Sequence, residues 1–356
     1  MRSIIGISII IIGILITAVV IGFRSELGSN NLSYDDEQKG LNQRIIIKFS
    51  HVVAENTPKG LAVDQFANLV SEKTNGKVEV QVYPNGILYS DKDEFQALWQ
   101  GNIQMIAPAY SKISTLYPSW MVLDLPFAFP NQQAVDESLH GEIGQILFHT
   151  LESKNMKGLA FWSNGFKQVT SNQHPILTPK DFREQKIRIM PSKVLEDQYR
   201  LLGAQPVPIP FNEVYQNIEN GTVDGQENTI SNIFTKRLYL GQKYLTLSNH
   251  GYLGYAVIVN KSFWDKLPSD IQDKIQEALQ ETSVWNNQKA VSMNEKQLNE
   301  LRTMSVLQIH ELTNEQRNQW IQATDPLYNK YADTIGYGLV NKVKQIRNKY
   351  AYPQPR

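Results

Sequence analysis

The 356-residue sequence contains no cysteine, and this absence excludes several kinds of site. Without thiols the chain forms no disulfide, holds no thiolate metal site and has no cysteine nucleophile. It also lacks the lipid-modified cysteine that holds many exported bacterial proteins at a membrane. The chain also has no excess of charge of either sign, because 35 basic residues balance 35 acidic ones. We therefore expect no nucleic-acid partner and no polybasic membrane patch.

The common signatures of catalysis are also missing. The sequence has no G-x-S-x-G, no P-loop, no H-E-x-x-H and no G-x-G-x-x-G after a strand-like run. Its six histidines show no metal-ligand spacing, and no carboxylate is paired by its sequence context with a base or a nucleophile. We therefore predict that the protein is not an enzyme and that it uses neither a cofactor nor a metal.

The N-terminal segment is apolar and long. Residues 4–23 carry no charge and lie between Arg2 and Arg24. About 20 apolar residues span a bilayer, whereas a signal-peptide core usually has about 7–15 and ends in a small-residue cleavage site. We favour an uncleaved anchor in residues 1–24 over a cleaved signal peptide, and both over a buried core helix. Residues 25–44 are polar and are predicted to be a flexible tether with a reach of roughly 25 Å.

The rest of the chain alternates strand and helix patterns, and its length favours two domains. Residues 45–49 are predicted to form a buried strand and residues 78–82 an alternating one. Between them, Thr57 and Pro58 have the residue types of a helix N-cap and its first helical position. This order implies a parallel crossover unit. A second such unit is expected from a strand at 186–190, a helix at 191–202 and a strand near 206–209.

A long helix is predicted near the C-terminus. Residues 269–303 have apolar positions at helical spacing and contain no glycine or proline. As one helix this segment is roughly 50 Å long, too long for one small domain; two shorter helices are the alternative. Thr313 and Gln316 then form a capping-box pair for a further helix.

The most specific pattern lies at residues 211–228. Its first half has helical spacing and ends at Gly221, where a helix C-terminus favours a left-handed residue. Its second half places amide and carboxylate side chains around Gly225, without a catalytic nucleophile. We interpret it as a backbone segment that approaches a ligand closely and offers it hydrogen-bond donors.

This pattern resembles the signature of the extracytoplasmic solute-binding proteins of tripartite ATP-independent periplasmic (TRAP) transporters, in their dicarboxylate-binding branch. The resemblance continues in order along the chain, in segments 49–60, 82–86, 124–129, 164–168, 186–192 and 249–251. It implies an α/β, two-domain periplasmic-binding-protein-like fold with a ligand cleft and one long helix spanning both domains. Residues 45–164 with about 252–290 would form domain I, and residues 165–251 with about 291–350 domain II.

Three cations are the leading ligand contacts. Arg188 lies at the end of a predicted strand, where open α/β sheets bind ligands, and its guanidinium grips a carboxylate through two parallel hydrogen bonds. The residues alone also allow a solvated arginine, but the resemblance implies a carboxylate clamp. Lys59 sits in a helix first turn, which favours anions, and it either shares an anion with the helix amides or points away. Lys167 follows a predicted turn and is either a ligand contact or a solvated loop lysine.

The remaining candidates are weaker. The resemblance makes Asn228 a polar ligand contact and Phe211 a cleft wall, although Phe211 alone reads as a core residue. Gln226 belongs to the same motif. His51 and His250 flank predicted cleft loops, although a lone histidine more often has a structural role. Ser111 is a candidate hydroxyl donor.

Together these features predict a protein that binds a small organic dianion of the succinate, malate or fumarate type. The resemblance implies delivery to TRAP membrane subunits for ion-gradient-driven uptake, from the periplasm or the outer face of the cell membrane. Three alternatives stay open: a co-receptor for a membrane sensor kinase, a binding protein for another organic acid, and an extracytoplasmic enzyme.

Overall fold

Two β-sheets organise the computed structural model, which describes residues 44–351. The first sheet has the order β2-β1-β3-β10-β4 and the second the order β11-β9-β5-β8-β6-β7. The strands are β1 (Ile45–Ser50), β2 (Val78–Tyr83), β3 (Met105–Ile106), β4 (Met156–Phe166), β5 (Gln168–Ser171), β6 (Lys186–Ile189), β7 (Gln205–Pro208), β8 (Gly225–Asn228), β9 (Tyr244–Leu247), β10 (Tyr252–Asn260) and β11 (Gln308–Glu311). The predicted anchor and nearly all of the tether lie outside the described residues.

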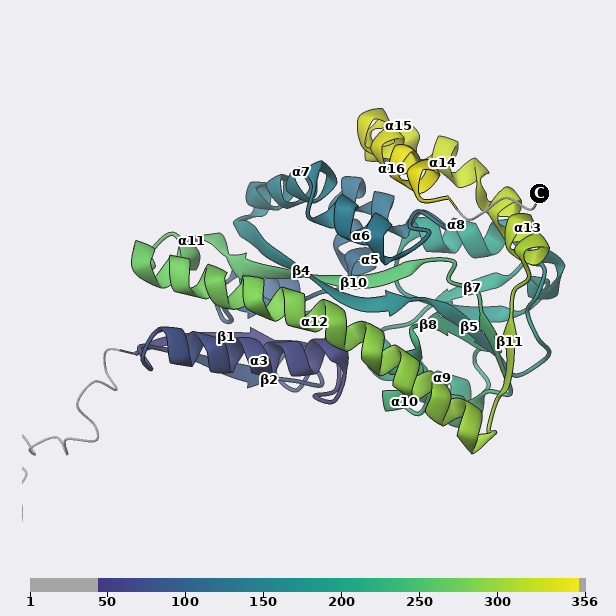
Figure 1. Cartoon of the computed structure of the whole chain (residues 1–356), viewed down its shortest axis with the longest axis horizontal. Helices are drawn as coiled ribbons and strands as arrows, with labels where there is room; N and C mark the ends of the chain where they lie inside the picture. The colour runs from purple at the N-terminus through teal and green to yellow at the C-terminus, as the bar shows by residue number, and fades with distance from the viewer. Residues whose placement is uncertain (1–43, 352–356) are drawn as a thin grey trace, which may run out of the picture. The chain divides into compact units, whose positions relative to one another are not determined.

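Helices cover both sheets (Figure 1). The α-helices are α3 (Pro58–Lys73), α4 (Glu94–Trp99), α5 (Tyr110–Ser114), α6 (Gln132–Leu139), α7 (Glu142–Leu151), α8 (Lys193–Leu201), α9 (Val214–Glu219), α10 (Ile230–Thr235), α11 (Lys261–Trp264), α12 (Ser269–Met304), α13 (Asn314–Thr324), α14 (Pro326–Lys330), α15 (Ala332–Ile335) and α16 (Tyr337–Lys349). Short 3₁₀ helices are η3 (Pro118–Asp124), η4 (Glu152–Lys154), η5 (Pro179–Phe182), η6 (Phe211–Glu213) and η7 (Leu238–Gly241). Within residues 44–351, none of the helices has the length and apolar character that a membrane span requires.

The first predicted crossover unit is confirmed. The Thr57 side chain accepts a hydrogen bond from the Gly60 amide, and Pro58 is the first residue of α3. Asn75 and Gly76 then take positive φ angles of 51° and 72° and end the helix. β1 and β2 pair in parallel along their whole length. The local signals and the tertiary pairing therefore agree, which is the pattern expected of a well-specified fold.

The second unit is also confirmed, with β6 parallel to β7 and Gly203 at φ +90° after α8. The capping box of Thr313 and Gln316 is present at the start of α13. The structure corrects our interpretation of Gly225, because residues 225–228 form a strand paired on both sides, to β5 and β6. A Cβ atom at Gly225 would lie 2.2 Å from the Thr170 carbonyl oxygen, so it is the β5 backbone, and not a ligand, that excludes a side chain there.

The chain passes between the sheets at neighbouring points. β4 of the first sheet continues through Lys167 into β5 of the second, and β9 returns through residues 248–251 into β10. The Lys167 amide donates to the Gly251 carbonyl across 2.8 Å, which joins the two crossings. We call the first sheet with its helices the first lobe and the second sheet with its helices the second lobe.

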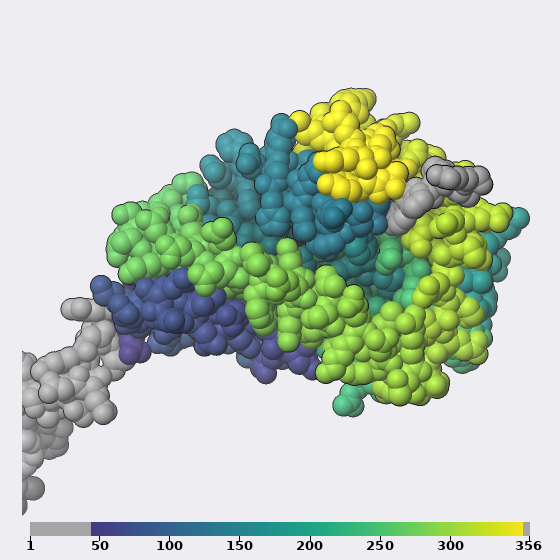
Figure 2. Space-filling view, in the orientation of Figure 1, coloured from purple at the N-terminus to yellow at the C-terminus, as the bar shows by residue number. Residues whose placement is uncertain are grey.

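The long helix α12 is continuous over 36 residues, which confirms one helix over two. At 1.5 Å per residue it is about 54 Å long. Its first half contributes Ile271 and Ile275 to the core beside β1 and α3, and Leu301 belongs to the core of the second lobe. In the space-filling view it lies diagonally across this face of the molecule (Figure 2). The helix therefore braces both lobes on one side.

The last helices pack against both lobes, since Tyr331 also bonds to Lys193 and Asp197 of α8. α14, α15 and α16 contribute Leu327, Tyr328, Ile335 and Val340 to the same core as Trp120 of the first lobe. The division of the chain into the two sequence-defined domains stays a prediction, but these helices bury their apolar faces against first-lobe residues.

Candidate functional site

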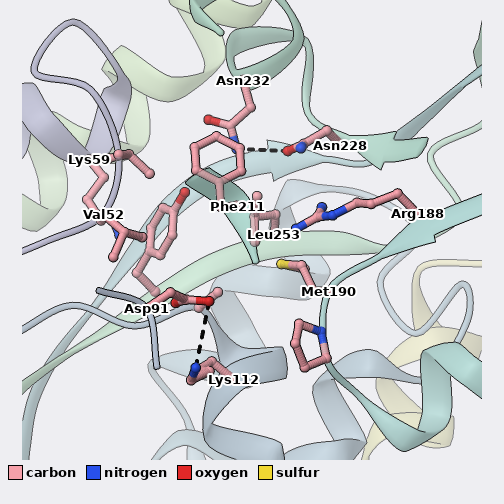
Figure 3. Close-up of a pocket in the computed structure, with 14 residues that line it drawn as sticks. Val52, Lys59, Asp91, Lys112, Arg188, Met190, Phe211, Asn228, Asn232 and Leu253 are labelled. Atoms are coloured by element: carbon pink, nitrogen blue, oxygen red, sulfur yellow. Dashed lines mark hydrogen bonds and ion pairs between the residues drawn. The ribbon is translucent and has the colours of Figure 1, made fainter. Parts of the chain in front are cut away.

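A charged cavity lies between the two lobes. Its empty space, including the part that is open to solvent, is about 480 Å³. The walls come from loops and strand ends of both lobes, as expected for an open α/β sheet. The first lobe supplies Val52, Val53, Lys59, Asp91, Ala109, Lys112, Leu253 and Tyr255, and the second supplies Arg188, Met190, Pro191, Phe211, Asn228 and Asn232 (Figure 3).

Arg188 reaches the cavity from β6. It is 1% exposed, and its Nε and Nη2 atoms donate to the Ile209 carbonyl at 3.0 and 2.7 Å. Its Nη1 atom has no hydrogen-bond partner among residues 44–351. Burial lowers the pKa of Arg188 to about 10, so the guanidinium is still charged at neutral pH. The carbonyl fixes one edge of the guanidinium and leaves the Nη1 end available to an anion.

Lys59 reaches the cavity from the first turn of α3. It is also 1% exposed; its Nζ atom donates to the Ala107 carbonyl at 2.9 Å and lies 4.0 Å from the Tyr255 ring centre. Burial lowers the pKa of Lys59 to about 8 against the opposing effect of Glu94. The expected sharing of an anion with the helix amides gains no support, because the Gly60 amide is capped by Thr57. The ammonium group of Lys59 therefore lines this wall as a buried cation.

Two further charges line the first-lobe wall. Asp91 precedes α4 and Lys112 lies on α5, and the Lys112 Nζ atom is 3.7 Å from an Asp91 carboxylate oxygen. Their side chains are 14% and 15% exposed, so this ion pair is largely sheltered from solvent. The distance is longer than a hydrogen bond, which leaves both groups able to bind a third partner.

Amide and aromatic groups complete the second-lobe wall. The Asn228 Oδ1 atom accepts hydrogen bonds from the Thr229 amide and from Asn232 Nδ2. These bonds assign the Asn228 carbonyl oxygen and leave its NH₂ group free to donate. Phe211 is a lining residue, and in the view of Figure 3 it lies between Lys59 and Asn228. The structure therefore brings Arg188, Lys59, Asn228 and Phe211 of the predicted set together.

Lys167 and His250 belong to a buried network beside the cavity and do not line it. Lys167 forms an ion pair of 2.9 Å with Glu227, which also accepts from His250 Nε2 at 3.0 Å. Burial favours a higher pKa for Glu227, but Lys167 and His250 outweigh it and hold the pKa at about 2. Burial lowers the pKa of His250. The structure thus places Lys167 with an internal carboxylate partner and neither in solvent nor on the cavity wall.

Ser111, Gln226 and His51 are also placed outside the cavity wall. The Ser111 hydroxyl donates to Asp124 at 2.5 Å, and the Gln226 amide donates to the Thr170 hydroxyl at 2.9 Å. His51 is fully buried, and burial lowers its pKa to about 3, so its ring is neutral. Within the described chain neither of its ring nitrogens has a hydrogen-bond partner.

Sequence reasoning missed Asp91, Lys112, Asn232 and Tyr255. Lys112 directly follows the Ser111 that we selected, one residue further along α5. Asp91 comes five residues after the segment 82–86, with no local pattern that marks it as a cavity residue. Only the fold brings these positions opposite Arg188.

A second hollow lies behind the crossings of the two lobes, with about 950 Å³ of empty space by the same measure. Its polar lining residues already bond to one another. Asn294, for example, donates to the Asn164 and Ala290 carbonyls, and Gln168 accepts from the Ser248 and Asn249 amides. The charged cavity is therefore the better candidate site. Residues 44–351 contain no cluster of acidic and histidine side chains that could hold a metal.

Two lobes joined by crossing strands, a brace helix and a charged cleft between the lobes define a solute-binding protein. The family model described as bacterial extracellular solute-binding protein, family 7 (DctP), matches residues 49–334, and the chain belongs to this family. These are extracytoplasmic transport proteins and not enzymes.

Three comparisons place the chain within that family. It is 47% identical over 347 residues to the C4-dicarboxylate-binding protein DctB of Bacillus subtilis, covering 98% of this chain and 99% of that protein. A TRAP periplasmic solute-binding protein of Sulfurospirillum deleyianum with bound succinate has a TM-score of 0.81 and 43% identity, over 85% of this chain and 99% of that one. A third, from Pseudomonas aeruginosa with bound L-malate, has a TM-score of 0.78 and 33% identity, over 81% and 100%.

Proposed function

We propose that the cavity binds a C4 dicarboxylate and that the protein delivers it to TRAP membrane subunits for ion-gradient-driven uptake. The observation that carries the proposal is the placement of cations on both walls. Arg188 belongs to the second lobe, whereas Lys59 and Lys112 belong to the first. A ligand with a carboxylate at each end can bond to both lobes at once. The similarity to DctB and to succinate- and malate-bound structures supports the same ligand class.

The charges of the cavity match this ligand. Three lining cations and the single lining carboxylate of Asp91 leave two positive charges in excess, counting the described lining residues. A charge-assisted hydrogen bond contributes on the order of 1.5–3 kcal/mol. Three or four such bonds are sufficient for roughly micromolar affinity. A monocarboxylate would leave one buried cation without a partner, which is costly.

Calorimetry with succinate and with a monocarboxylate of similar length tests this proposal. We expect succinate to bind at least about 100-fold more tightly, which corresponds to roughly 2.7 kcal/mol. Equal affinity for butyrate and succinate would remove the dicarboxylate assignment. The absence of binding to any of succinate, malate and fumarate would reject the function as a whole.

We propose in addition that residues 4–23 stay on the mature protein as a membrane anchor. The support is the length of the uncharged run and the lack of an A-x-A-like cleavage site in residues 18–23. The intact mass of the protein extracted from its native membrane decides this, since a mature N-terminus after Ile21 would mean a cleaved signal peptide.

A further inference from the structure

The carboxylate of Asp91 is the unusual group in a cavity built for anions. Asp91 lines the cavity opposite Arg188 and contacts Lys112 at 3.7 Å. Within residues 44–351 its oxygens take part in that ion pair and accept no hydrogen bond. An ionised carboxylate is an acceptor with about four lone-pair sites. Asp91 therefore has unused acceptor capacity at the site where an anion is expected.

The neighbouring acidic residue, Glu94, differs from Asp91 in its burial and its protonation state. Glu94 is 1% exposed, and burial raises its pKa to about 8, so this carboxyl is mostly protonated at neutral pH. Asp91 is partly exposed and paired with Lys112, and it is the carboxylate on the cavity wall. Any ligand dianion must lie near its negative charge. A methylene group there satisfies none of its lone pairs, whereas a hydroxyl group donates to one.

We propose that Asp91 is a specificity-determining residue that accepts a hydrogen bond from a hydroxyl on the ligand's carbon chain. The inference rests on the proposed function, because the two end carboxylates must first be held by Arg188 and Lys59. Figure 3 shows Asp91 on the first-lobe wall, between Lys59 and Met190 in this view. A four-carbon diacid stretched between the two cations presents its middle carbons to this side. The site then selects 2-hydroxy C4 dicarboxylates over unsubstituted ones.

This preference for a hydroxyl group follows from the free-energy cost of a desolvated acceptor that has no hydrogen-bond donor. A site that is built to bond a ligand hydroxyl discriminates strongly against the analogue without it, because the polar group of the protein is left unpaired. Lys112 lowers that cost without removing it, since 3.7 Å is too long for a hydrogen bond. We expect the full chain to bind the tighter enantiomer of malate at least tenfold more tightly than succinate.

The test is calorimetry of L-malate, D-malate and succinate with the parent protein and with Asp91→Ala. In this variant the malate-to-succinate ratio should fall to within about twofold. Malate loses its acceptor, whereas succinate is held as well or better once the opposing charge is gone. Asp91→Asn, which keeps a carbonyl acceptor without the charge, should give an intermediate ratio. The exposed Asp93, two residues away, is the matched control, and Asp93→Ala should keep the parent ratio.

The outcomes separate this inference from the function on which it rests. Equal affinity of the parent protein for malate and succinate would overturn the role of Asp91 and leave dicarboxylate binding intact. A proportional change of both affinities in Asp91→Ala would also overturn it, because Asp91 would then act only as the partner of Lys112. Failure of both ligands to bind the parent protein would reject the proposed function as well.

Discussion

Arg188 illustrates how one backbone group decides what a side chain can do. Its Nε and Nη2 atoms already bond to the Ile209 carbonyl, which orients the guanidinium before any ligand arrives. In the proposed complex the Nη1 end, which has no hydrogen-bond partner among residues 44–351, meets a carboxylate with little further loss of side-chain entropy. A lysine has the same charge, but its single ammonium cannot serve the carbonyl and the ligand in this geometry.

Arg188→Lys should therefore weaken succinate binding at least tenfold although the charge is conserved. Isothermal calorimetry at neutral pH measures this directly. Thermal unfolding of the variant without ligand shows whether the fold survives the loss of the Ile209 contact. An unchanged affinity in a folded variant would exclude Arg188 from the ligand site.

Lys59 and Glu94 predict the pH dependence of binding. Burial lowers the pKa of Lys59 and raises that of Glu94, to about 8 in both cases. Above pH 8 Lys59 on the wall loses its positive charge and Glu94 behind the wall gains a negative one, and both changes oppose a dianion. Arg188, with a pKa of about 10, stays charged over this range. Succinate affinity should thus be nearly constant below pH 7.5 and about tenfold weaker at pH 9.

Calorimetry at pH 7 and pH 9 checks this expectation, and buffers of different ionisation enthalpy report the accompanying proton uptake at pH 8. Lys59→Met should bind weakly with a much smaller pH dependence. An affinity that does not change between pH 7 and pH 9 would show that neither group titrates beside the ligand.

Individual site residues were predictable only where a strand end or a helix start marked them. Arg188 follows alternating residues of β6, and Lys59 follows the cap of α3, so both lie where the local pattern places a ligand. Lys167 follows an equally suggestive turn, yet it lies against Glu227 from a strand 60 residues further on. Whether a buried lysine meets a ligand or an internal carboxylate is decided by tertiary pairing, which no local pattern contains.

At the scale of elements, β8 has a packing role as well as a binding role. It is paired with β5 and β6, and its four residues are all buried. Glu227 on this strand holds Lys167 from the crossing between the lobes, while its neighbour Asn228 lines the cavity. The motif at residues 211–228 thus combines two side chains that line the cavity, Phe211 and Asn228, with several that fix the second sheet.

The pair of Lys167 and Glu227 predicts a strong coupling in stability. Removing one partner of a buried ion pair leaves an uncompensated charge and typically costs about 3–5 kcal/mol, whereas removing both costs much less than the sum. A double-mutant cycle tests this. It compares the free energies of unfolding in urea of the parent protein, Lys167→Met, Glu227→Gln and the double variant. We expect a coupling energy above about 1 kcal/mol.

The surface pair of Lys342 and Glu142, at 2.6 Å and 36% and 65% exposed, is the matched control. The same cycle on this surface pair should give a coupling energy of about 0–1 kcal/mol. If the buried cycle gave no more coupling than the surface cycle, the ion pair would contribute nothing specific to the junction of the lobes.

Elements were more predictable than their contacts. Caps, stops and alternating patterns located β1, α3, β2 and α12, because these signals are local. The short strand β8 was misread because amide and carboxylate side chains around Gly225 are typical of a loop. Close approach to the Thr170 carbonyl, a contact between distant parts of the chain, is what requires glycine there.

For the whole molecule, the division of charge between the lobes decides which ligands the cleft accepts. Arg188 belongs to one lobe, and Lys59 with Lys112 to the other. Both Arg188 and Lys59 are 1% exposed, so each cation is largely shielded from solvent. Closing around a ligand with one carboxylate would desolvate a cation without a partner, and the second carboxylate removes that cost.

Lys59→Met should therefore reduce the difference in affinity between succinate and butyrate, mostly by weakening the binding of succinate. The expected gap falls from at least about 100-fold to roughly tenfold or less, as measured by calorimetry on both ligands. Lys77→Met is the matched control, because Lys77 is exposed in the same lobe and lies away from the cavity. Lys167→Met should lower stability and leave the gap in place, since its partner is Glu227. If the succinate-to-butyrate affinity ratio did not change in Lys59→Met, Lys112 would hold the second carboxylate. If the ratio fell in Lys167→Met, the buried network, and not the cavity wall, would recognise that carboxylate.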